Sequence, residues 1–119
     1  MDEIILLLEK LNFSKTEAAV YIDLLKNSSS NGYKIAKNLN MSRSSVYSAL
    51  DNLYKKGIIF LLPGDSQVYK AENPSVLINK MKNEFNETTN LLDSKLKDLE
   101  KCDSEERYVN IEGYDNIIF

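Results

Sequence analysis

Apolar residues recur at intervals of three and four positions along the first part of the chain and predict two helices there. The first is a short apolar helix over residues 3–11, which would have to be covered, for example by a second subunit. The second begins after Ser14, because Ser14 and Glu17 have the spacing of a capping box. Its apolar face consists of Ala18, Tyr21, Ile22 and Leu25. Turn-forming residues at positions 27–32 end this helix.

Two more helices are predicted on either side of a tight turn at Asn40. The segment YKIAKNLNMS has too few apolar residues for an independent helix, but enough for one that packs against neighbours. Asn40 tolerates the left-handed conformation that a tight turn requires. Ser42 then caps a helix over residues 42–56, which ends at Gly57. The core face of this helix consists of Val46, Ala49, Leu50 and Leu53.

The second half of the chain predicts a hairpin, a long helix and a short strand. Two β-favouring runs between positions 58 and 71 flank the turn PGDS, which is typical of a β-hairpin. Pro74 suits the first turn of a helix, with Asn73 as its cap. The apolar seam of this helix consists of Ile78, Met81, Phe85, Leu92 and Leu99. A short β-like run follows at 108–111, and the apolar tail after it should pack against something.

This order of elements is that of a winged helix-turn-helix. The fold class is therefore mainly α (α+β), with a two-stranded wing and a long C-terminal dimerisation helix. We expect the winged domain at residues 1–73 and a coiled-coil-like helix at residues 74–103. Residues 104–119 would form a short strand and tail, which is a candidate stump of a further domain.

The residue inventory excludes most catalytic chemistry. The chain of 119 residues allows one compact core, and it has one cysteine and no histidine. Zinc sites and Ser/His or Cys/His catalysis are therefore disfavoured, so we expect no enzyme and no cofactor. The single Cys102 allows no intramolecular disulfide, and the start MDEIILLLEK fits neither a signal peptide nor a membrane span. The expected location is the cytoplasm, without membrane contact.

The distribution of charge favours a nucleic-acid partner, although the net charge is −3. Residues 28–70 hold six Lys and Arg and two acids, whereas both flanking segments are acidic. The local sign of the charge governs what approaches a surface. The predicted helix-turn-helix therefore lies in a basic block.

The helix over 42–56 is the candidate for insertion into the major groove of double-stranded DNA. Its N-terminal end offers backbone N–H groups, a positive dipole, Arg43 and small hydroxyls that permit close approach. Tyr33, Tyr54 and Tyr69 are expected in the core or at its edge. The predicted DNA-binding residues are Lys34, Lys37, Ser42, Arg43, Ser44, Ser45, Tyr47, Ser48, Asn52, Lys55, Ser66, Gln67 and Lys70.

Competing interpretations exist for these features. A serine-rich helix start is usually only a cap, and Asp51 on the outer face is unfavourable for DNA. The prediction therefore depends on the combination of turn, apolar stripe, hairpin and basic block. The seam from Ile78 to Leu99 can serve intrachain packing, membrane contact or pairing with a second copy. Mixed charges disfavour a membrane, so we expect a homodimer, which doubles the DNA contact.

The sequence resembles the TrmB family of transcriptional regulators, which are largely archaeal and best known for sugar-responsive control. The resemblance lies in LNFSKTEAAVYIDLL, in GYKIAKNLNMSRSSVYSALDNLYKKGII, in VYKAENP and in the long helix that follows. The segment SRSSVYSALDNLYKKG is similar to the recognition helix of the family. The residues at matching places are Arg43, Val46, Tyr47, Leu50, Leu53 and Gly57.

The resemblance implies a homodimeric, sequence-specific DNA-binding transcription regulator. Longer family members continue into an effector-binding domain, and YVNIEGYDNIIF resembles its first strand and turn. We therefore expect a fragment or a short member that lacks the sugar-binding half, and we assign no effector. The alternative function is a winged-helix adaptor that binds another protein with the same surface.

Overall fold

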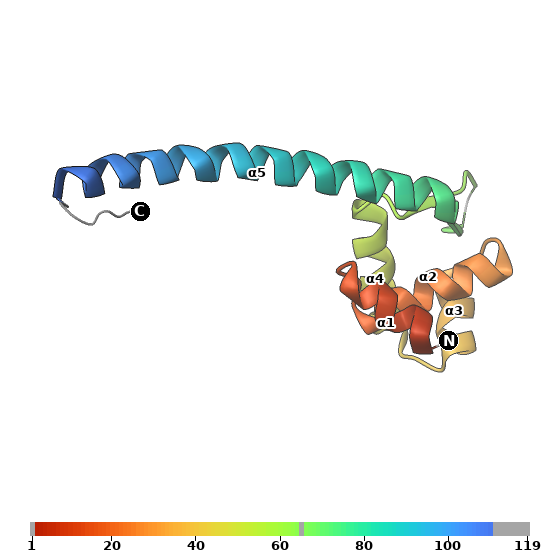
Figure 1. The fold of residues 1–119 in the computed structure, drawn as a ribbon. Coiled ribbons are helices and arrows are strands. Elements are labelled where there is room, and N and C mark those ends of the chain that lie inside the picture. The colour runs from red at the N-terminus through yellow and green to blue at the C-terminus, as the bar shows by residue number, and fades with distance from the viewer. Residues whose placement is uncertain (1, 65, 111–119) are drawn as a thin grey trace. The chain divides into compact units, whose positions relative to one another are not determined.

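The computed structural model describes residues 2–64 and 66–110, without the side chains of residues 102–110. Its elements are α1 (Asp2–Lys10), α2 (Lys15–Asn27), α3 (Gly32–Leu39), α4 (Arg43–Lys55), β1 (Ile59–Leu61), β2 (Tyr69–Ala71) and α5 (Pro74–Asn110) (Figure 1). This order confirms the predicted fold class. The contacts divide the chain into two compact units, residues 1–77 and 78–119. The domain limits expected from the sequence stay predictions.

The predicted capping box starts α2. The Ser14 hydroxyl accepts a hydrogen bond from the Glu17 N–H at 3.0 Å, and the Glu17 carboxylate accepts one from the Ser14 N–H at 3.1 Å. Two backbone donors that would otherwise be orphaned at the helix start are thus satisfied. The predicted apolar face is buried at Ala18, Tyr21 and Ile22, whereas Leu25 is exposed.

The two turns that flank α4 follow from left-handed residues. Asn40 adopts φ 55°, and the N–H of Met41 bonds back to the carbonyl of Ala36 at 3.0 Å. Gly57 adopts φ 76°, and the N–H of Ile58 bonds back to the carbonyl of Leu53 at 3.0 Å. Both closures are Schellman motifs, in which a left-handed residue lets the chain reverse while the last helical carbonyls stay paired. The helix-turn-helix geometry is therefore set by local backbone chemistry.

The core of the winged unit forms where α2, α3 and α4 meet the hairpin. Each of these helices contacts the other two, and α2 and α4 also contact β2 and β1 respectively. The predicted core face of α4 is confirmed, because Val46, Ala49, Leu50 and Leu53 are all buried. The largest fully buried side chains are Leu24, Ile35, Leu50, Leu53, Ile59, Val20 and Val46.

The wing is a two-stranded antiparallel hairpin that is tied to the rest of the unit. Ile59 pairs with Ala71 and Leu61 with Tyr69. Ser30, in the loop before α3, adds an isolated bridge by exchanging two backbone hydrogen bonds with Tyr69, at 3.0 and 2.7 Å. The sequence pattern gave no sign of this bridge, because Ser30 lies in a stretch with ordinary turn chemistry.

A tyrosine of α2 holds the chain segment that follows β2. The Tyr21 hydroxyl donates to the carbonyl of Glu72 at 2.9 Å, and the N–H of Glu72 donates to the carbonyl of Ile58. Burial, with a smaller contribution from Glu72, raises the pKa of the Tyr21 phenol above its ordinary value. The phenol therefore keeps its proton and remains a hydrogen-bond donor at neutral pH.

Helix α5 begins as predicted but extends further than predicted. The Asn73 side chain accepts hydrogen bonds from the N–H groups of Ser75 and Val76, at 2.8 and 3.4 Å. The helix continues through Asn110, so the strand predicted over 108–111 is wrong at 108–110. Helical hydrogen bonding along a continuous polar helix prevails there over the local β propensity. Residues 111–119, with the apolar tail, lie outside the described residues.

Glu17 connects the start of α2 to α4. Its carboxylate, with a side chain 8% exposed, also accepts from the Asn52 amide at 3.3 Å and from the Lys56 ammonium at 3.4 Å. One buried carboxylate thus has three donors on two helices. Removing it would leave the Ser14 N–H without its partner and would break both contacts to α4, although Lys56 also donates to the carbonyl of Asn12 and Asn52 is exposed to water.

We predict that Glu17→Ala lowers the free energy of unfolding by about 2–3 kcal/mol, because it removes a helix cap and two interhelical hydrogen bonds. Glu17→Gln keeps an acceptor and should cost about half as much. The control is Asp93→Ala, since Asp93 forms an exposed pair with Lys97 and its loss should change little. Urea denaturation followed by circular dichroism measures all three. Equal effects for Glu17→Ala and Asp93→Ala would contradict the role of Glu17.

Candidate nucleic-acid interface

The N-terminus of α4 carries a network of small hydroxyls. The Ser42 hydroxyl accepts from the N–H of Ser45 at 3.2 Å and donates to the Ser45 hydroxyl at 2.9 Å. Ser44 lies 3.4 Å from the same Ser42 oxygen. Ser42 is therefore a helix cap, as predicted from its position, and all three side chains are exposed. The serines keep the helix start narrow and leave its positive end accessible.

Arg43 follows the cap and lies over an aromatic ring of the preceding helix. Its guanidinium carbon is 4.7 Å from the centre of the Tyr33 ring, which is a cation–π distance. Tyr33 is on α3 and is half-exposed. The stacking restricts the rotamers of Arg43 while its donors stay exposed. Arg43 therefore loses less side-chain entropy when it binds a ligand.

Tyr47 is held by close approach to the start of α3. A Cβ atom on Gly32 would overlap the Tyr47 ring, so this position has room only for glycine while the ring stays in place. The ring of Tyr47 is 43% exposed. Its phenol is therefore supported by the backbone of α3 on one side and is accessible on the other.

The remaining tyrosines are divided between core and edge. Tyr69 is buried in the core as expected, whereas Tyr33 and Tyr54 lie half-exposed at its edge. Burial raises the pKa of the Tyr69 phenol above its ordinary value, and Asp51, Tyr47 and Tyr54 nearby add to the effect. This phenol stays neutral at physiological pH, so it adds no negative charge beneath α4.

Two predicted contact residues of α4 already have protein partners. The Asn52 amide donates to Glu17, as described above, so its side chain points toward α2. The Lys55 ammonium lies 3.0 Å from the Asp51 carboxylate, and both groups are exposed. An exposed pair one helical turn apart is weak, so Lys55 can exchange Asp51 for another anion. Asn52, in contrast, has a positioning role in this structure.

A shallow polar groove of about 400 Å³ runs between the start of α2 and α4. Its lining consists of Ser14, Thr16, Glu17, Ser44, Ser45, Ser48, Ala49 and Asn52. The structure thus places the α4 serines beside the hydroxyls of Ser14 and Thr16. The sequence analysis predicted Ser14 only as a cap and did not single out Thr16, because this proximity arises from the packing of α2 on α4.

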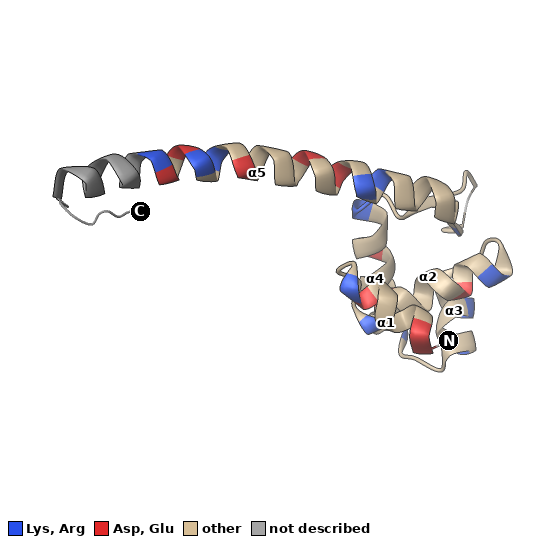
Figure 2. Ribbon diagram, in the orientation of Figure 1, with Lys and Arg blue, Asp and Glu red and all other residues tan. Residues whose placement is uncertain are grey.

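The other predicted contact residues are exposed on α3 and in the wing. Lys34 and Lys37 lie on α3, and Ser66, Gln67 and Lys70 lie in or beside the hairpin. Figure 2 shows basic positions on α3, whereas acids and bases alternate along the described part of α5. The excess of positive over negative charge therefore lies in residues 28–70, which contain the helix-turn-helix and the wing.

Within the described part of the chain, no group of three or more His, Cys, Asp or Glu residues is arranged to hold a metal ion. Over the same residues, no helix has the length and apolar character that crossing a membrane requires.

Comparison with known proteins identifies sequence relatives of the chain. The chain is 26% identical over 84 residues to the HTH-type sugar sensing transcriptional regulator TrmBL1 of Pyrococcus furiosus, covering 71% of this chain and 25% of the relative. It is 35% identical over 63 residues to the uncharacterized protein YrhO of Bacillus subtilis, covering 53% and 23%. The chain thus spans about a quarter of the length of these relatives. Because one relative is bacterial, an archaeal source stays a prediction.

Two solved structures have a similar fold. TrmBL2, described as an archaeal chromatin protein with a novel mode of DNA binding, matches with a TM-score of 0.88 at 20% identity, over 99% of this chain and 46% of that chain. A possible transcriptional regulator from Methanosarcina mazei Go1 matches with a TM-score of 0.63 at 19% identity, over 74% and 80%. At these identities the likeness concerns the fold.

The family model for the sugar-specific transcriptional regulator TrmB matches residues 8–75, which include α2, α3, α4 and the wing. This match covers more than half of the chain and contains the interface described above. The relatives with assigned roles are regulators and DNA-binding proteins rather than enzymes, as the residue inventory predicted. The chain belongs to the TrmB family of DNA-binding transcriptional regulators.

Proposed function

We propose that this protein is a homodimeric, sequence-specific transcription regulator that inserts α4 into the major groove of double-stranded DNA. The observation that carries the proposal is the exposed, capped N-terminus of α4, with Arg43 stacked on Tyr33. Such an end combines a positive helix dipole with a restrained guanidinium, which suits both phosphates and guanine edges. The role of regulator agrees with membership of the family.

The residues of α4 would divide between reading and positioning. Arg43 has the fork of donors that binds a guanine edge or a phosphate in a bidentate manner. Ser44, Ser45 and Ser48 are short enough to bond bases or phosphates at close approach, and the Tyr47 phenol suits a phosphate. Ser42 and Asn52 would act on the protein side, because their polar groups hold the helix start and the contact with Glu17.

The lysines of α3 and the residues of the wing would hold the DNA backbone. Lys34 and Lys37 are exposed one helix before α4, and Lys70 lies on β2. Ser66 and Gln67 are exposed in the hairpin loop. Contacts to phosphates position a protein on DNA without reading its sequence, and they make binding dependent on salt. Lys55 joins this set when it exchanges Asp51 for a phosphate.

Pairing of two copies would occur along α5. The predicted seam residues Ile78, Phe85, Leu92 and Leu99 are all between 47% and 69% exposed, and Met81 is partly exposed. Leu91 and Leu96, which the sequence analysis did not include, are also exposed. Leu96 lies four residues after Leu92 and three before Leu99, so it fits the three-four spacing of the seam. Apolar residues at this spacing on an exposed helix favour a coiled coil.

One relative has a name that refers to an effector. TrmBL1 is named a sugar sensing regulator, but the matched segment is a quarter of that protein. We therefore assign no effector to this chain. A DNA-bound regulator would act in the cytoplasm, together with the chromosome.

We predict that binding to the operator weakens roughly ten-fold or more between 50 and 200 mM salt, because several phosphates release counterions. Lys34→Ala should weaken binding to all sequences alike and lower the salt slope by about one. The matched control is Lys26→Ala, which removes an exposed lysine from the end of α2. Fluorescence anisotropy with genomic fragments selected by the protein measures these slopes. A slope near zero would instead favour the adaptor function.

Arg43→Ala should cost about 1–3 kcal/mol of binding free energy and relax the preference for one base position. Tyr33→Leu should cost about 0.5–1 kcal/mol through loss of the stacking, whereas Tyr33→Phe should retain most of the affinity. In the Arg43→Ala background, Tyr33→Leu should have little further effect. Competition binding against operator variants provides the measurement. Additive losses would show that Tyr33 does not act through Arg43.

The double substitution of Phe85→Asp and Leu92→Asp should yield monomers in light scattering, because it places charges in the apolar seam of α5. The matched control is Asn83→Asp with Asn90→Asp, which adds the same charges at the same spacing on exposed positions off the seam. Dimers that persist after the seam substitutions would mean that α5 is not the main interface.

A further inference from the structure

Helix α1 presents an apolar surface that its own chain leaves uncovered. None of its described residues is buried, although the helix packs against α2. Leu6 and Leu7 are more than half exposed, and so is Leu11 just beyond the helix end. A single exposed leucine needs no explanation, but a contiguous group on a short helix marks an interaction surface.

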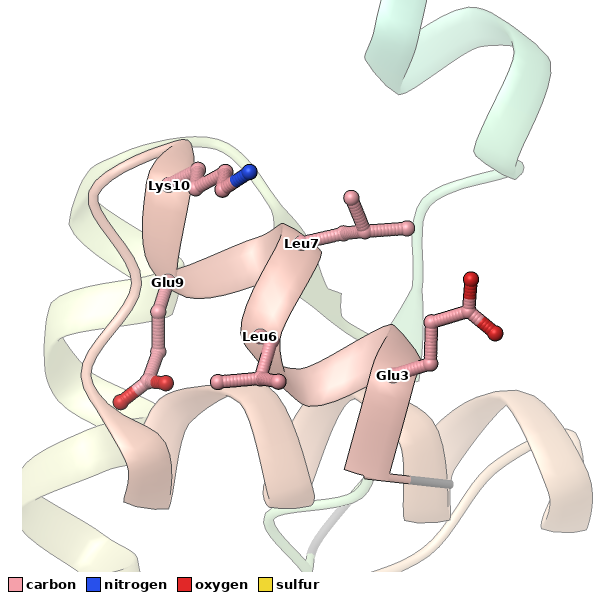
Figure 3. A pocket seen from close by; sticks show the side chains of 5 residues that line it. All are labelled: Glu3, Leu6, Leu7, Glu9 and Lys10. Atoms are coloured by element: carbon pink, nitrogen blue, oxygen red, sulfur yellow. The ribbon is translucent and has the colours of Figure 1, made fainter.

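The two ends of α1 differ in charge. Asp2 and Glu3 occupy the first turn, and the last turn holds Lys10 next to Glu9, whose side chain lies outside the stripe of Glu3, Leu7 and Lys10. Figure 3 shows Glu3, Leu7 and Lys10 pointing to the same side of the helix, whereas Leu6 points away from that side. With roughly 100° of rotation per residue, the four positions fall within an arc of about 100°, and Leu6 lies at its edge. They line a hollow of about 540 Å³ together with Glu9.

We propose that this face of α1 pairs in antiparallel orientation with α1 of a second copy of the chain. Glu3 then faces the partner subunit's Lys10, and Leu7 faces the partner subunit's Leu7, with Leu6 at the edge of the contact. The same contacts recur in reverse across a two-fold axis. An interface of this kind requires a surface that is complementary to itself, and an acidic end, an apolar centre and a basic end in one stripe provide it.

Other occupants fit this face less well. A membrane surface would be repelled by the acids that border the leucines, and DNA would be repelled for the same reason. A partner of another kind would have to present the same sequence of base, apolar pair and acid in reverse. A second copy of α1 presents that arrangement by definition.

The proposed pairing of α1 would form together with the α5 contact of the dimer. A helix of nine residues is about 14 Å long, and its exposed face is far smaller than the roughly 800 Å² per partner that a stable interface buries. The inference therefore rests on the dimer of the proposed function, in which α5 keeps two copies together. Pairing of α1 is then effectively intramolecular and needs little area of its own.

The pairing would have a consequence for DNA recognition. Helix α1 packs on α2, and α2 packs on α4. A contact between two α1 helices therefore restrains the distance between the two α4 helices. Dimeric helix-turn-helix proteins read half-sites about 34–36 Å apart, so α1 would help select the spacing of the half-sites.

Cysteine trapping tests the pairing directly, in the full chain with Cys102→Ser. Positions 3 and 10 of one helix are about 10 Å apart, which is too far for a disulfide within one copy. Neither Glu3→Cys nor Lys10→Cys alone should form covalent dimers under mild oxidation, whereas an equimolar mixture of the two variants should. The control is a mixture of Lys15→Cys and Lys26→Cys, which should remain monomeric on non-reducing gels.

Charge exchange gives a second, independent measurement. Glu3→Lys or Lys10→Glu should raise the dimer dissociation constant about threefold or more, because each places like charges opposite each other twice. The double variant should return to within about twofold of the original protein. Sedimentation equilibrium at low salt measures the constants.

The outcomes separate this inference from the proposed function. Dimers by light scattering without trapping in the mixture would overturn the α1 pairing and leave the α5 dimer intact. Absence of any dimer would overturn both. If Leu6→Glu with Leu7→Glu lowers the free energy of unfolding and leaves the dimer constant unchanged, the face packs within its own chain and the inference is wrong.

Discussion

The contact between the Glu17 carboxylate and α4 is the interaction on which the candidate interface depends. Glu17 first closes the capping box that starts α2, and the same carboxylate then receives the Asn52 amide and the Lys56 ammonium. A buried carboxylate with well-placed donors is specific in geometry, because any other arrangement leaves charged or polar groups unpaired. The contact therefore restrains the orientation of α4 relative to α2. The apolar core supplies most of the stability, and this contact adds a polar restraint between the two helices.

Local charge and local restraint explain how an acidic protein can present the DNA-binding surface proposed above. The net charge of −3 is distributed so that the helix-turn-helix is basic and the flanking segments are acidic. Within that block, Arg43 stacks on Tyr33 and the Tyr47 ring rests against the start of α3 at Gly32. A guanidinium and a phenol with few accessible rotamers lose less entropy when they bind. The function of the surface thus depends on neighbouring residues that are not themselves expected to contact bases.

Helices α1 and α5 each leave a group of large apolar side chains exposed, and both groups contact a second copy of the chain in the proposals above. On α5 the exposed residues repeat with the spacing of a coiled coil, and on α1 they lie between an acidic and a basic end. The two surfaces differ in physical character. In the proposed dimer, the long α5 seam would hold two copies together, whereas the small α1 face would depend on that proximity. Together they would give a dimer whose two reading helices are held at a restrained distance.

The sequence by itself determined four local features: the capping box at Ser14 and Glu17, the left-handed turn at Asn40, the cap at Ser42 and the buried stripe of α4. These depend on residues within a few positions of one another, so spacing and backbone propensity are sufficient to predict them. Only the tertiary structure decided that Asn52 bonds Glu17, that Arg43 stacks on Tyr33 and that Ser30 bridges to Tyr69. Each of these contacts joins different elements, and the pairing depends on packing angles that no local pattern encodes. The strand expected near 108 was wrong for a related reason, because helical propagation from Pro74 outweighed the β propensity of a few residues.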